Sequence, residues 1–135
     1  MVKKGILETN QQKARWFEMM VKEHFENESK DLSGDNCTYP FDGICPKGQT
    51  YDAKGSKFDG TYWKYCLSNT YIEQIDWFYL GGFNKSFKKL LYVWRIPGDF
   101  IDKGTMLIGI NDRCIHNIAN MKEYDITDKF LNILR

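Results

Sequence analysis

Residues 39–63 of this 135-residue chain read YPFDGICPKGQTYDAKGSKFDGTYW. Short aromatic and β-branched pieces alternate here with Gly, Pro and Asp, which is typical of strands joined by tight turns. We expect strands at 37–42, 49–54 and 61–67. Turn-forming residues lie between them, at 46–48 and at 59–60, so the first two strands are predicted to pair as a hairpin.

Two acidic residues and one lysine in this hairpin have a suggestive spacing. Asp52 follows Asp42 by ten residues, and Lys54 follows Asp52 by two. Side chains alternate along a strand, so Asp52 and Lys54 point to the same side, and a hairpin partner can bring Asp42 to face them. Two neighbouring carboxylates repel each other unless a cation lies between them, and Mg²⁺ takes oxygen ligands. We predict a Mg²⁺ site at Asp42 and Asp52, with the backbone carbonyl of Ala53 as a further ligand.

An acid, any residue and then lysine is a weak motif alone, because the same pattern occurs at Glu28-Ser29-Lys30. Its second occurrence, at 52–54, gains weight from Asp42. There Lys54 would orient the attacking water or stabilise the developing negative charge. The structural alternative is that the two aspartates are strand-end carboxylates paired with this lysine.

Residues 11–25 have the apolar spacing of an amphipathic helix. Glu18 lies on this helix between apolar residues that would press it towards the sheet, so we predict it to be the third acid of the site. Glu23 is the alternative. A solvated carboxylate on the helix surface is the competing interpretation of Glu18.

Farther along the chain, apolar runs at 77–83 and 90–96 predict buried strands joined by a polar loop at 84–89. A further strand is expected at 106–110 and a helix at 125–134. The chain is therefore expected to form one α+β domain over residues 1–135. Its sheet would have about five or six strands, flanked by an N-terminal and a C-terminal helix.

The charge balance limits how nucleic acid could be bound. The formal net charge is +1, so a DNA-binding surface must be a local patch. Ser56, Lys57 and Lys64 lie close to the predicted site in the sequence and are candidate contacts to the phosphate backbone. Lys85, Lys88 and Lys89 form a second basic cluster, either a solvated loop face or a second contact.

The sequence has no apolar run long enough to cross a bilayer and no apolar segment behind its N-terminus, so a cytoplasmic protein without membrane contact is expected. Its four cysteines have no Cys-x-x-Cys pair and no His at ligand spacing. We assign them no role. A thiol or zinc protein would require all four to converge.

The order of these motifs resembles the PD-(D/E)xK nuclease superfamily, which has the restriction-endonuclease-like fold. Pro40-Phe41-Asp42 followed by Asp52-Ala53-Lys54 is similar to its bipartite motif. The segments that continue the likeness to small archaeal, phage or intron-associated nuclease domains are 51–57, 60–63, 75–78 and 92–98. The likeness covers roughly residues 12–110 and departs from the pattern at two positions. The second acid is Asp where Glu is commoner, and Pro46 lies in the hairpin turn.

This resemblance implies a central mixed sheet with helices on both sides and hydrolysis of phosphodiester bonds that depends on Mg²⁺, with Mn²⁺ as a substitute. It also implies DNA as the substrate and, often, a homodimer that cuts both strands. Asp42 and Asp52 take the places of the two motif acids, Lys54 that of the lysine and Glu18 that of the helix acid. The alternative function is a catalytically inactive nucleic-acid-binding module on the same fold.

Overall fold

The computed structural model describes residues 10–24, 30–31, 43–44, 48–67, 72–114 and 116–134. The helices are α2 (Asn10–His24) and α3 (Thr127–Leu134), with 3-10 turns η1 (Ile72–Gln74), η2 (Gly98–Phe100) and η3 (Lys122–Tyr124). The strands are β1 (Lys30–Asp31), β2 (Gly43–Ile44), β3 (Thr50–Lys57), β4 (Trp63–Cys66), β5 (Trp77–Phe83), β6 (Leu90–Pro97), β7 (Leu107–Asn111) and β8 (His116–Asn117). The protein is thus α+β, as predicted.

The described strands form two sheets, where we expected one. A five-stranded sheet has the order β1-β2-β3-β5-β6, and a three-stranded sheet has the order β4-β7-β8. The larger sheet is mixed, because β3 and β5 are parallel while β2 pairs with β3, and β6 with β5, in antiparallel fashion. The chain leaves the larger sheet after β3, forms β4 in the smaller sheet and returns as β5, and this crossover makes the parallel pairing possible.

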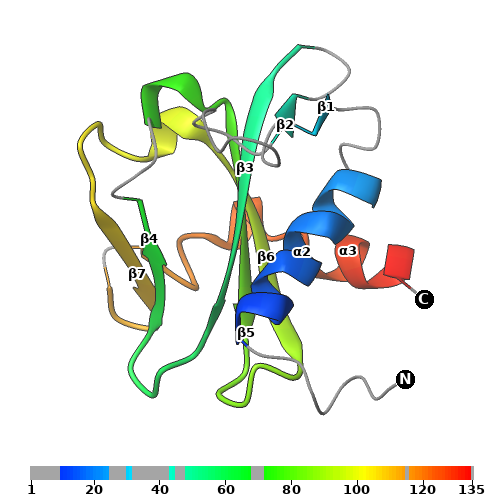
Figure 1. Cartoon of the computed structure of the whole chain (residues 1–135). Helices are drawn as coiled ribbons and strands as arrows, with labels where there is room; N and C mark the ends of the chain where they lie inside the picture. Colours follow the sequence, from blue (N-terminus) through cyan, green and yellow to red (C-terminus); the bar gives the residue numbers. More distant parts are fainter. Residues whose placement is uncertain are drawn as a thin grey trace.

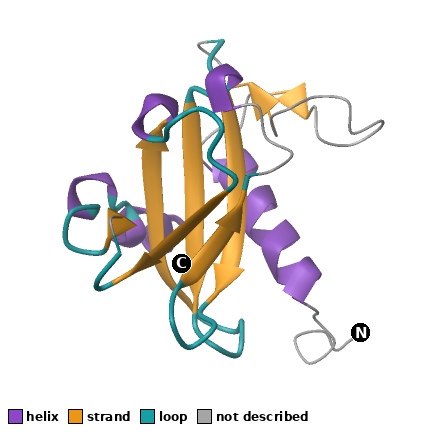
Figure 2. Cartoon of the chain, turned by 90° about the vertical axis from the view of Figure 1, so that its left-hand side faces the viewer, coloured by secondary structure: helices purple, strands orange, loops and turns teal. Residues whose placement is uncertain are grey.

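Three layers result (Figures 1 and 2): α2 and α3, the five-stranded sheet, and the three-stranded sheet. Phe17 and Val21 of α2 and Phe130 of α3 all belong to one buried cluster on a single face of the larger sheet, here called the helix-side core. The expectation of helices on both sides therefore does not hold for the described helices. β4 and β7 cover the other face instead.

The second cluster, here called the inter-sheet core, lies between the two sheets. Trp63 and Tyr65 of β4 and Ile110 of β7 pack there against Leu80 and Trp94 of the larger sheet. β4 buries alternate residues, and its exposed positions face outwards, as expected for a sheet with one solvated face. The strand pattern thus directs its aromatic residues into the molecule.

Two adjacent glycines explain how both layers approach β5 so closely. A Cβ on Gly81 would lie 2.8 Å from the Phe17 ring of α2. A Cβ on Gly82 would lie 3.2 Å from the Trp63 ring on the opposite face. Since successive residues of a strand face opposite sides, each glycine provides space for one large ring.

The starts of the two parallel strands are joined by a polar contact. The backbone N–H of Thr50 donates to Asp76 Oδ2 at 2.8 Å, and the backbone N–H of Asp76 donates to Thr50 Oγ1 at 3.0 Å. Thr50 Oγ1 also donates to the carbonyl of Gln74 at 2.6 Å. These bonds fix the register in which β3 enters the sheet.

Several predicted elements are confirmed. β5 coincides with the run 77–83, β6 extends the run 90–96 by one residue, and α2 begins and ends one residue earlier than expected. The predicted strand at 37–42 lies outside the described residues. No helix in the described part of the chain is long and apolar enough to span a membrane.

Candidate active site

β3 brings two of the predicted site residues into direct contact. Lys54 Nζ lies 3.1 Å from Asp52 Oδ2. Asp52 is 5% exposed and is the one charged residue that is buried among the described residues. Burying a carboxylate is costly unless it is paired, so this ion pair is required by the position of Asp52 in the sheet.

The pleat of β3 explains why these two side chains meet. Tyr51 and Ala53 belong to the helix-side core, so alternation directs Asp52 and Lys54 to the other face of the strand. β5 holds this part of β3 through the parallel pairs Asp52↔Phe78 and Lys54↔Leu80. The predicted i, i+2 relation is therefore confirmed on a strand whose position is fixed by its neighbour.

Glu18 of α2 lies within electrostatic range of this pair. Burial and, secondarily, the Asp52 carboxylate raise the pKa of Glu18 from its ordinary value of 4.5 to about 7, while the charges of Lys54 and Arg15 lower it. Glu23 on the same helix is exposed. The structure thus favours Glu18 over Glu23 as the third acid.

Asp42 lies outside the described residues. Its successor in the sequence, Gly43, pairs with Tyr51, the predecessor of Asp52, and Ile44 pairs with Thr50. An antiparallel hairpin is thus present here, but its first strand is 43–44, beyond the strand predicted at 37–42, so the predicted pairing of 37–42 with 49–54 stays a prediction. The meeting of Asp42 with Asp52 stays a prediction.

The donor set for a metal is incomplete within the described residues. No group of three Asp, Glu, His or Cys side chains that could hold an ion is found among them. The Asp52 carboxylate contributes to the raised pKa of Glu18, after burial as the larger cause. Carboxylate oxygens are the ligands that Mg²⁺ prefers, so the chemistry of these two side chains fits the ion.

The three predicted nucleic-acid contacts lie in different surroundings. Ser56 and Lys57 continue β3 beyond Lys54, and the Lys57 side chain is exposed. Lys64 lies on the outer face of β4, where its ammonium is 3.6 Å from Asp59 Oδ2 and 5.2 Å from the centroid of the Tyr62 ring. The structure therefore does not group Lys64 with Asp52 and Lys54.

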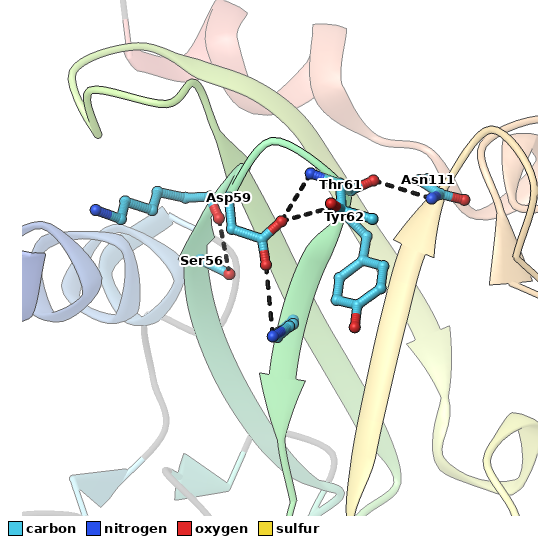
Figure 3. A network of polar contacts seen from close by, with 7 residues as sticks. Ser56, Asp59, Thr61, Tyr62 and Asn111 are labelled. Carbon is cyan, nitrogen blue, oxygen red and sulfur yellow. Dashed lines mark hydrogen bonds and ion pairs between the residues drawn. The ribbon is translucent and has the colours of Figure 1, made fainter.

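Asp59 organises the turn between β3 and β4 (Figure 3). Its Oδ1 accepts the backbone N–H groups of Thr61 and Tyr62 at 2.8 and 2.9 Å. These two donors, that of Tyr62 first, lower the pKa of Asp59. Asn111 Nδ2 donates to the carbonyl of Thr61 at 2.9 Å and ties the turn to β7.

An open cleft of about 750 Å³ lies beside this turn, and sequence reasoning did not identify it. Tyr92, Lys85 and Arg113 are among its lining residues, and they come from β6, from the loop before it and from the loop after β7. Of these three residues, the sequence predicts a nucleic-acid contact only for Lys85. For the loop after β7, the sequence signal was the polar run Asn111-Asp112-Arg113 at the end of a predicted strand.

In the part of the chain that the structure describes, His116 and the cysteines belong to no group of side chains that could hold a metal. The His116 ring packs on Phe100, with ring centroids 5.1 Å apart. Cys66 is exposed and Cys114 is half-buried, and Cys37 and Cys45 lie outside the described residues.

Comparisons with known proteins assign no family to the chain. No protein-family model matches it, and no curated protein matches it.

Proposed function

We propose that this protein is a metal-dependent nuclease that hydrolyses phosphodiester bonds in DNA. The observation that carries the proposal is the buried ion pair of Asp52 and Lys54, 3.1 Å apart on β3, with the raised pKa of Glu18 beside it. Perturbed ionisable groups that cluster around a buried charge are typical of catalytic sites. The mixed sheet, with its acid-x-Lys strand next to a helix that carries an acid, supports a restriction-endonuclease-like core.

Asp52 would hold Mg²⁺, or Mn²⁺ in its place, together with Asp42 and the backbone carbonyl of Ala53. Carboxylate and carbonyl oxygens are the ligands this ion prefers. When bound, the cation supplies charge neutralisation at the scissile phosphate and activation of the attacking water.

The other side chains have distinct tasks. Lys54, through its contact with Asp52 Oδ2, fixes the orientation of that carboxylate and presents a positive charge to the phosphate oxygens. Glu18, with its pKa near 7, is suited to accept a proton from water at neutral pH. Ser56 and the exposed Lys57, farther along β3, would contact the phosphodiester backbone.

A catalytically inactive nucleic-acid-binding module is the second candidate. Lys54 alone can neutralise Asp52, and no three-residue ligand group occurs among the described residues. In that case the Asp52–Lys54 ion pair would only stabilise the sheet, and the exposed lysines would bind the nucleic-acid backbone without cleaving it. Cleavage distinguishes the two functions.

The test is a cleavage assay on duplex, single-stranded and branched DNA with Mg²⁺ or Mn²⁺. The wild-type protein should cut at least one of these substrates, and EDTA should abolish cutting. Asp52→Asn, which keeps the shape of the side chain, should lose about 10²- to 10⁴-fold in rate. Asp102→Asn, at an exposed position outside the site, is the matched control and should cut normally.

A wild-type protein that cuts none of the three substrates with either cation would leave the binding module as the better account. Cutting that survives Asp52→Asn would move the active site away from β3. Circular dichroism of both variants shows whether a loss of rate reflects a loss of folding. A homodimer stays a prediction, which sedimentation can check.

A further inference from the structure

The cleft next to the β3–β4 turn combines aromatic and basic side chains. The Tyr92 ring is half-buried and stacks on the Trp94 ring, with centroids 5.1 Å apart and planes 7° apart. The Trp63 ring meets it edge-on at 5.5 Å. Two buried indoles therefore hold the Tyr92 ring in a fixed orientation at the cleft, which makes it a preorganised surface for stacking.

Two exposed cations border the same cleft. Lys85 follows β5, and its ammonium lies 3.9 Å from the position that a Cβ on Gly60 would occupy, so it reaches the β3–β4 turn. Arg113 follows β7. One acid, Asp112, is also in the lining, so the cleft carries an excess of positive charge. Aromatic rings between cations are the usual means of holding single-stranded nucleic acid.

The walls of the cleft are fixed by hydrogen bonds. Asn111 donates to the carbonyl of Thr61 (Figure 3). It also accepts the backbone N–H of Arg113 at 2.7 Å, so it joins the β3–β4 turn to the loop after β7. The loop between β5 and β6 also borders the cleft, and there Asn84 Oδ1 accepts the backbone N–H groups of Lys88 and Lys89 at 2.9 and 3.2 Å. The side chains that border the cleft thus project from ordered loops, which reduces the entropy lost when a ligand binds.

β3 connects the cleft with the Asp52–Lys54 pair. Alternation places Phe58, which lines the cleft, on the same side of the chain as Asp52, six residues earlier. At about 3.3 Å per residue, they are about 20 Å apart along the strand. This distance corresponds to about six stacked nucleotides at about 3.4 Å each. Ser56 lies between the two places on the same side of the chain, and the exposed Lys57 next to it points to the opposite side.

We propose that this cleft binds an unpaired nucleotide of a DNA strand whose backbone runs along the edge of β3, beyond the two residues paired with β2, towards the Asp52–Lys54 site. The base would stack on Tyr92, and the flanking phosphates would contact Lys85 and Arg113. The inference rests on the proposed nuclease function and narrows its substrate to DNA with a single-stranded segment. A base within an intact duplex could not reach the Tyr92 ring.

The test measures binding in EDTA, so that no cleavage occurs and the result is independent of the nuclease assay. The probe is a fluorescein-labelled oligothymidylate of about 20 nucleotides, followed by fluorescence anisotropy. Tyr92→Leu should weaken binding roughly five- to a hundredfold, the usual contribution of one stacked base. Tyr92→Phe keeps the ring and should bind as the wild type does.

The cations are tested through salt dependence. In the double variant Lys85→Ala/Arg113→Ala, the slope of log K against log salt should fall in magnitude by about 1.4, since each phosphate contact to a single strand contributes about 0.7. The matched control, Lys103→Ala/Lys122→Ala, removes two exposed charges outside the cleft and should leave the slope unchanged. Thermal melts show that the variants are folded.

The proposal is overturned if the wild-type protein does not bind the oligonucleotide, or if Tyr92→Leu binds as tightly as Tyr92→Phe. An unchanged salt slope in Lys85→Ala/Arg113→Ala also overturns it, as does an unlabelled duplex that competes as well as a single strand. Binding that depends on the cleft without any cleavage by the wild-type protein would leave the cleft in place and reject the nuclease function. Cleavage by the wild-type protein, together with binding that does not depend on the cleft residues, would reject the cleft proposal and leave the nuclease function in place.

Discussion

Replacement of Glu18 by Gln should make the protein more stable at pH 8. Burial and the Asp52 carboxylate raise the pKa of Glu18 from 4.5 to about 7, so ionisation of this residue opposes folding. A rise of that size corresponds to at most about 3 kcal/mol of unfolding free energy. The Glu18 carboxyl is partly exposed to solvent, which screens its charge, and we expect about 1–2 kcal/mol.

The direction of the pH dependence follows from proton binding. Below pH 4.5 Glu18 is protonated in both the folded and the unfolded chain, so Glu18→Gln and the wild type should be equally stable. Between pH 4.5 and 7 the folded protein binds more protons than the unfolded chain, and the wild type loses stability as the pH rises. Above pH 7 the unfolding free energy of Glu18→Gln should exceed that of the wild type by its full amount.

The assay is urea unfolding of both proteins in EDTA at several pH values, with the difference in unfolding free energy taken at each pH. Glu23→Gln, the same substitution at an exposed position on the same helix, is the matched control. In an Asp52→Asn background the effect of Glu18→Gln should shrink without vanishing, because burial is the larger cause. A difference that stays flat from pH 4 to pH 8, or Glu18→Gln being less stable at pH 8, would refute this reasoning.

Three further predictions concern the scaffold. Gly98→Ala should lower the unfolding free energy by about 1–3 kcal/mol or more in urea unfolding, because the new Cβ would lie 1.8 Å from the Ile75 carbonyl oxygen. Asn111→Ala should cost about 1–3 kcal/mol by the same measurement, since it leaves the bonds that join two loops unmade. Tyr65→Phe should lower the unfolding free energy by about 1–2 kcal/mol, because the buried Tyr65 hydroxyl donates to the Gly81 carbonyl at 3.0 Å. For each of these three variants, a stability equal to that of the wild type would contradict the contact on which its prediction rests.

The strand and helix positions could be predicted where the apolar pattern is continuous. β5 and β6 are long apolar runs bounded by turn residues, and they appear close to their predicted bounds. β3 extends three residues beyond its predicted end at Lys54, although Gly55 disfavours strands. The reason is tertiary: a Cβ at Gly55 would lie 3.4 Å from the α2 backbone at Ala14, so the helix covers the strand there.

The layer arrangement could not be predicted, because an alternating pattern does not specify which sheet a strand joins. β4 has the pattern of a third meander strand, yet it pairs with β7 in the smaller sheet. The parallel pairing of β3 with β5 depends on this passage of the chain through the smaller sheet. The role of Gly81 and Gly82, which leave space for the Phe17 and Trp63 rings, could not be predicted without knowing the layers on both faces of β5.

Part of the candidate site followed directly from sequence spacing. The i, i+2 relation of Asp52 and Lys54 requires only a strand, and the placement of Glu18 requires only that the helix pack beside it. The cleft around Tyr92 was not predictable, because Lys85 and Arg113 reach it from loops far apart in the chain.

The most direct test of the account is a calorimetric titration of the protein with Mn²⁺ at pH 8. The wild-type protein should have a saturable Mn²⁺ site that Asp102→Asn retains. Asp52→Asn should lose this site or bind Mn²⁺ at least about tenfold more weakly, because replacing even an outer-shell partner of a metal ligand costs about 10- to 100-fold in affinity. Glu18→Gln should bind more weakly than Glu23→Gln. A wild-type protein that binds no Mn²⁺, or an Asp52→Asn variant that binds it as tightly as the wild type, would contradict the claim that Asp52 on β3 holds a divalent cation.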